Sequence, residues 1–175
     1  MCVFFYFQTQ PLIVKNVPLS TKDIRFDNIR GGSNPVCMFV GLIPQQNLAG
    51  DPSDSSTHFR RHGVSEMNIT LNGNSVNGYP LTCKYGSPII PFQKFIQTTG
   101  RHYNINAGET VTCDQFKTGW VWSHKFEAET SNQGWIGINF NLEKEFTQNM
   151  VMVVWIVSHH SVSIDKFHQL EKIKV

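Results

Sequence analysis

The sequence predicts an all-β domain: a two-sheet jelly-roll sandwich of about eight strands, with one or two short helices in its loops. The run Met150–Val157 is continuously apolar and rich in β-branched residues, which is typical of a strand buried on both faces. Short extended segments recur between polar turns along most of the chain. Only 16% of the 175 residues are charged while 12% are aromatic, and this composition suits a β domain with a sizeable core.

Within the predicted strands, the spacing of apolar residues indicates which faces are buried. Met67, Ile69 and Leu71 alternate with polar residues, so this strand has one buried and one wet face. The following Asn72-Gly73 pair predicts a tight hairpin turn, since both residues tolerate positive φ. The strands are expected at residues 12–17, 24–26, 36–43, 67–71, 120–122, 135–138 and 150–157, followed by a polar, alternating end strand at 158–165.

Two short helical segments are expected between the strands. Gly100 can end the first helix, and Pro91 is acceptable in its first turn. The second begins at Thr112, because Thr112 and Gln115 have the spacing of a capping box. The apolar residues of the first helix share one helical face: Ile89, Phe92, Phe95 and Ile96.

Charge and hydropathy limit the classes of partner. The net charge is +2 and no basic block occurs, so we expect no specific nucleic-acid partner. Met1–Phe7 is apolar but much shorter than the ~20 residues that a membrane span requires, and no membrane span is expected. The four cysteines form no CxxC pair, which favours reduced thiols over a zinc site or a disulfide framework: Cys2, Cys37, Cys83 and Cys113.

Enzymatic chemistry is not expected from this sequence. His58, His62 and Glu66 would share a helical face and could bind a divalent metal, but Gly63 and Arg60-Arg61 favour an exposed loop there. His159-His160 would face opposite sides of a strand. There is no Gly-x-Ser-x-Gly motif and no Gly-rich phosphate loop followed by Lys. The sequence therefore predicts a non-enzyme with no metal and no cofactor.

A carbohydrate-binding sandwich is the alternative function, and a cupin-like metal enzyme is a less favoured one. In the first case an exposed tryptophan would stack on a sugar ring. All three candidates lie within strand patterns, so core packing is favoured for each: Trp120, Trp122 and Trp135.

Several blocks of the sequence resemble, in order, the hexon-like major capsid proteins of adintoviruses and Polinton (Maverick) elements. An apolar strand ends in Val40-Gly41-Leu42 and is followed by a loop with an Ala49-Gly50 step. Asp114–Trp120 is similar to the family's Asp-x-Phe-x-x-Gly-aromatic turn into a strand. Further similar blocks extend the resemblance over residues 11–167: 67–73, 79–81, 92–100, 137–142, 147–155 and 162–165.

The resemblance implies a viral or element-derived structural protein. Family members carry two jelly rolls, and this chain resembles the C-terminal one, with residues 1–10 as an unassigned N-terminal stump and 168–175 as a C-terminal tail. Three such chains form a pseudo-hexagonal capsomer, so the implied partners are further copies, neighbouring capsomers and minor capsid proteins. The implied location is the virion capsid, assembled in the host cytoplasm or nucleus. A fragment, a degraded reading frame and a host-retained domain are all compatible with the resemblance.

Aromatic residues in or beside loops are the candidates for subunit contacts, because such residues anchor protein interfaces. The opposite interpretation, that each closes an end of the sandwich, has equal weight. The candidates are Phe59, Tyr79, Tyr85 and Tyr103.

Overall fold

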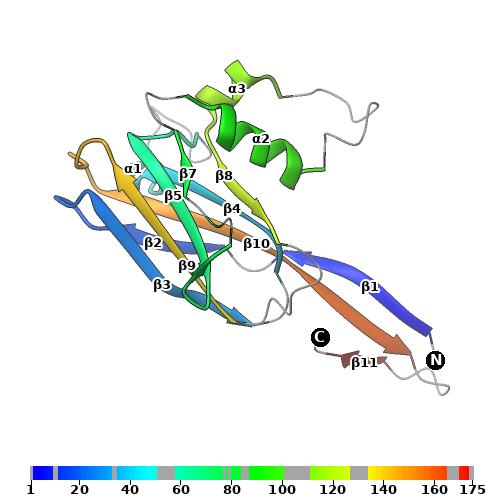
Figure 1. The fold of residues 1–175 in the computed structure, drawn as a ribbon. Helices are drawn as coiled ribbons and strands as arrows, with labels where there is room; N and C mark the ends of the chain where they lie inside the picture. The colour runs from blue at the N-terminus through cyan, green and yellow to red at the C-terminus, as the bar shows by residue number, and fades with distance from the viewer. Residues whose placement is uncertain are drawn as a thin grey trace.

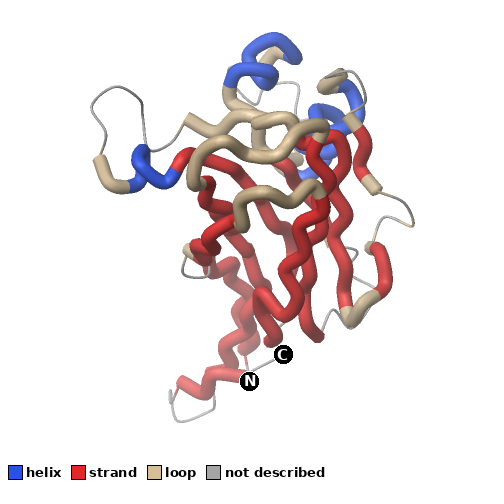
Figure 2. Tube along the Cα trace, turned by 90° about the vertical axis from the view of Figure 1, so that its left-hand side faces the viewer, coloured by secondary structure: helices blue, strands red, loops and turns tan. Residues whose placement is uncertain are grey.

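Two antiparallel β-sheets pack face to face and the helices gather towards one end (Figures 1 and 2). The structure is a computed structural model. It describes residues 2–9, 12–32, 35–50, 58–76, 78, 80–83, 87–100, 111–126, 134–164 and 170–173.

The first sheet, sheet A, is built around the longest strand of the described chain. β10 (Met150–Ile164) pairs with β4 on one side and with β2 and β1 in succession on the other. β4 in turn pairs with β8. The other strands of sheet A are β1 (Cys2–Thr9), β2 (Ile13–Val17), β4 (Pro35–Pro44), β8 (Trp122–Lys125) and β11 (Leu170–Ile173).

The second sheet, sheet B, has β9 between β3 and β5, with two short strands pairing beyond β5. A hairpin turn joins β5 to β6, with φ of 53° at Asn72 and 83° at Gly73, as the sequence predicted. The strands of sheet B are β3 (Asp23–Gly32), β5 (Val64–Leu71), β6 (Asn74–Ser75), β7 (Leu81–Thr82) and β9 (Gly134–Leu142).

The strand order is that of a jelly roll. Sheet A contains β2-β10-β4-β8 and sheet B contains β3-β9-β5 followed by the short β6 and β7. The chain crosses from one sheet to the other between β2 and β3, β3 and β4, and β4 and β5, and again between β8, β9 and β10. This alternation buries one face of each sheet against the other and confirms the predicted all-β sandwich.

Three helices lie in the described parts of the connections, and the sequence predicted two of them. α2 (Ile89–Thr98) begins after Pro88, and Gly100 follows it with φ of 71°. α3 (Cys113–Thr118) carries the predicted capping box: Gln115 N donates to Thr112 Oγ1 at 3.2 Å and Thr112 N donates to Gln115 Oε1 at 2.8 Å. α1 (Gln45–Leu48), a single turn after β4, was not predicted. It has no side-chain cap and no apolar periodicity that could indicate a helix in the sequence.

The main core lies between the sheets. Phe116, Trp120 and Trp122 form a chain of ring contacts at this core, with successive centroids 5.2 and 5.6 Å apart. Ile138 and Phe140 face the same core from β9. Both faces of the first half of β10 are buried, as predicted: Met152, Val154 and Ile156 belong to the main core, while Val151 and Val153 belong to a separate cluster on the other face.

An arm extends from the end of the sandwich away from the helices (Figure 1). It is the C-terminal half of β10, which continues as a strand to Ile164 and pairs with β1 and β11. β1 lies within the segment that the sequence left unassigned. Its partners in register run from Thr9 opposite Val157 to Cys2 opposite Ile164.

Candidate functional site

The outer face of sheet A carries an apolar cluster, the sheet A outer cluster, made of Ile43, Val151, Val153, Phe59 and Trp155. Phe59 meets Trp155 edge to face with ring centroids 5.1 Å apart. Its ring also covers Gly41, where an added Cβ would lie only 2.2 Å from Phe59 Cδ1. The glycine therefore makes room for the phenyl ring, and Phe59 is half-buried within the protein.

The sheet A outer cluster borders exposed apolar residues of β2. Val14 is the register partner of Val153 and is 44% exposed, while Leu12, directly before β2, is 46% exposed. β2 lies at the margin of the sheet, so no further strand covers these side chains within the described residues. The apolar surface on this side of the molecule thus runs from half-buried aromatic rings to exposed aliphatic groups.

The other predicted contact residues, Tyr79, Tyr85 and Tyr103, lie outside the described residues. The residues considered for a metal site do not come together. His58 Nε2 lies 3.2 Å from the carbonyl oxygen of Thr118, whereas Glu66 projects from β5 towards Asn141. In the part of the chain that the structure describes, no three His, Cys, Asp or Glu side chains are close enough to hold a metal ion.

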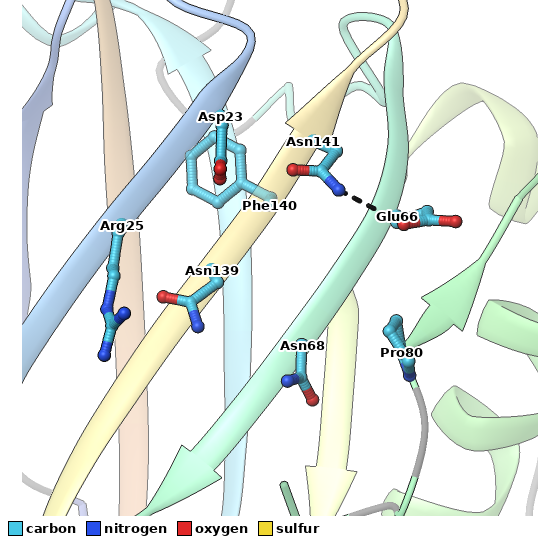
Figure 3. A pocket seen from close by; sticks show the side chains of 8 residues that line it. All are labelled: Asp23, Arg25, Glu66, Asn68, Pro80, Asn139, Phe140 and Asn141. Atoms are coloured by element: carbon cyan, nitrogen blue, oxygen red, sulfur yellow. Dashed lines mark hydrogen bonds between the residues drawn. The ribbon is translucent and has the colours of Figure 1, made fainter. Parts of the chain in front are cut away.

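A polar groove of about 250 Å³ crosses the outer face of sheet B (Figure 3). The pairing of β3, β9 and β5 places its side chains in two rows across three strands. One row is Asp23–Asn141–Glu66 and the next is Arg25–Asn139–Asn68. Pro80 and Phe140 complete the lining.

Hydrogen bonds hold several side chains of this groove, while one acceptor atom in it has no partner within the described residues. Asn141 Nδ2 donates to Glu66 Oε2 at 3.2 Å, and Asn68 Oδ1 accepts from Ser75 Oγ at 2.6 Å. Arg25 Nε donates to Asp27 Oδ1 at 2.9 Å at the exposed edge of the groove. By contrast, the Oδ1 atom of Asn139 is buried and accepts no hydrogen bond within the described residues.

Trp135 lies on the same outer face of β9, and its position corrects a prediction. The strand pattern favoured core packing for all three candidate tryptophans, and Trp120 and Trp122 are indeed 2% and 1% exposed. Trp135 is 56% exposed, because its register partner on β3 is Gly31, which has no side chain to cover the indole. Asn72 holds its backbone: Asn72 N donates to Trp135 O at 2.9 Å, and Trp135 N donates to Asn72 Oδ1 at 3.0 Å.

The sequence signal for the groove is the alternation in β9, where Asn139 and Asn141 alternate with the buried Ile138 and Phe140. The sequence predicts the same alternation in β5, but nothing in the sequence shows that the polar faces of β5 and β9 lie side by side. Their adjacency depends on register between strands about seventy residues apart, as in the pairing of Asn68 with Asn139.

The described cysteines fit the expectation of reduced thiols. Cys37, Cys83 and Cys113 are all free. Burial raises the pKa of the Cys37 and Cys83 thiols, so both are protonated near neutral pH. Neither thiol therefore has the thiolate character that a nucleophile requires.

None of the helices within the described residues is long and apolar enough to cross a membrane. No protein-family model matches the chain, and no curated protein matches it either.

Proposed function

We propose that this protein is a structural subunit of a shell: the C-terminal jelly roll of a hexon-like capsid protein that contributes to trimeric, pseudo-hexagonal capsomers. The observation that carries the proposal is the strand order, β2-β10-β4-β8 against β3-β9-β5 with β6 and β7. This is the architecture that the sequence resemblance implied, and jelly rolls are a common building block of viral capsids.

The sheet A side of the molecule supports self-association. Exposed Leu12 and Val14 continue the sheet A outer cluster, so a partner that covered them would extend an existing apolar layer. Interface centres are apolar and enriched in aromatic residues, as Phe59 and Trp155 would be here. The companion jelly roll or a second copy would cover this side, and the loops at the helix end would contact neighbours in the shell.

The test is the oligomeric state of the purified chain. Light scattering over a range of concentrations should show association, and negative-stain microscopy should show no closed shells, because a capsomer needs the companion jelly roll as well. Replacing Leu12 and Val14 together with Glu should shift the chain towards monomer, since charged side chains oppose burial of this surface.

The matched control is Leu48→Glu, because Leu48 is exposed to a similar extent, 41%, but lies beyond the end of β4. Circular dichroism establishes that each variant is folded. A monodisperse monomer for the unmodified chain at all concentrations would contradict the proposal, and regular shells would contradict the assignment to a double-barrel capsid protein.

A further inference from the structure

The polar groove on the outer face of sheet B has no part in the proposed assembly role, since it lies on the side of the sandwich opposite to Leu12 and Val14. We propose that this groove binds a neutral oligosaccharide, whose hydroxyl groups bond to the asparagine amides and one of whose rings stacks on Trp135.

The shape and polarity of the groove exclude most small apolar ligands. Apart from Pro80 and Phe140, its lining side chains are amides, carboxylates and a guanidinium, whereas sites for drug-like molecules are mostly apolar. The two rows are about 7 Å apart along the strands and span about 10 Å across three strands. This open, flat outline is comparable to the footprint of a disaccharide.

The amide groups match the chemistry of sugar hydroxyls. Each hydroxyl can donate and accept, and each asparagine amide offers an acceptor beside a donor group. Asn139 is the central residue, because it lies between Arg25 and Asn68 in its row. Its Oδ1 has no partner within the described residues, so the amide can turn about χ2 to meet a ligand without losing a bond there.

The charges of the groove select a neutral ligand. Among the described residues, Arg25 is the one basic residue of the lining and already pairs with Asp27, while Asp23 and Glu66 are both acidic. This described lining therefore carries no excess positive charge to attract phosphate, sulfate or uronate groups. Asp23 and Glu66 can accept hydrogen bonds from hydroxyl groups instead.

Trp135 supplies the apolar part of the site. It lies four residues before Asn139 on the same face of β9, about 13 Å away along the strand, which is the length of a short oligosaccharide. On that face of β9 only Gly137 lies between them, and side-chain oxygens of Thr70 and Asp27 lie next to it. The two hydrogen bonds to Asn72 hold the strand, so the exposed indole is presented at a fixed position.

The test is ligand-observed NMR, by saturation transfer, on the full chain with four neutral trisaccharides: maltotriose, cellotriose, mannotriose and triacetylchitotriose. A heparin-derived hexasaccharide is the anionic probe. At least one neutral probe should bind at millimolar concentration, and Asn139→Ala and Trp135→Ala should each weaken binding about tenfold. Trp135→Tyr, which retains an aromatic face, should preserve most of the affinity.

Asn16→Ala is the matched control, because Asn16 is an exposed strand asparagine on the other sheet, and its affinity should equal that of the unmodified chain. Melting curves show that every variant is folded. The proposal is overturned if none of the four neutral probes binds, if only the heparin fragment binds, or if binding is the same in Asn139→Ala and Trp135→Ala as in the control.

Discussion

The outer faces of the two sheets differ in polarity. On sheet A, the outward residues of β10 at Val151 and Val153 are as inaccessible as those that face the core. On sheet B, the outward residues of β9 at Asn139 and Asn141 are polar and line a groove. The same strand geometry thus yields a face suited to packing against protein and a face suited to hydrophilic ligands. The residue types at the outward positions of each strand determine which kind of face forms.

The largest expected effect comes from placing a charge on either face of β10. Val153→Asp and Val154→Asp should each abolish soluble folding, because an unpaired buried charge costs several kcal/mol out of a total stability of about 5–15 kcal/mol. Asn16→Asp, at an exposed position of β2, should fold normally. Soluble yield and circular dichroism measure all three, and a folded Val153→Asp protein would show that the outer face of sheet A is not closed.

The sequence predicted the buried strand and missed the groove for the same physical reason. An unbroken apolar run such as 150–157 reports the burial of both its faces without reference to any neighbour. The helix-end signals of α2 and α3 likewise depend only on residues close together in the sequence. The groove instead needs Arg25, Asn139 and Asn68 in one row, which only the register between three distant strands provides. Trp135 was assigned to the core because the strand pattern could not reveal that its neighbour is Gly31.

A second, smaller effect tests burial at the edge of sheet A. His124 on β8 is the register partner of the buried Met38 and is only 6% exposed. Burial, with a smaller contribution from Lys94, lowers the pKa of His124 from 6.5 to about 4. The native state therefore holds this imidazole neutral, while the unfolded state takes up a proton as the pH falls below about 6.5.

It follows that His124 destabilises the fold progressively from about pH 6.5 down to about pH 4, by up to about 3 kcal/mol, with no further loss below that. Urea denaturation across this range should show a loss that His124→Gln lacks, and carboxylate contributions common to both proteins cancel in the difference. His124→Asn, a second substitution that removes the ionisable ring, should show the same difference from the unmodified chain. Parallel profiles for His124→Gln and the unmodified protein would mean that the edge of sheet A is open to water.

The smallest expected effect distinguishes a binding face from a merely solvated one. Asparagine is a poor strand former, and Asn139 also carries a buried acceptor without a partner in the described part of the chain. Asn139→Val should therefore raise the free energy of unfolding by about 0.5–1 kcal/mol. Asn16→Val on β2 changes the same residue type at an exposed strand position that has no buried acceptor without a partner, so it should give the smaller gain. Urea midpoints of the two variants measure the difference. A loss of stability in Asn139→Val would mean that the amide supports the sheet. A gain larger than that of Asn16→Val would mean that Asn139 lowers the stability of sheet B, as residues that serve ligand binding commonly lower the stability of a protein.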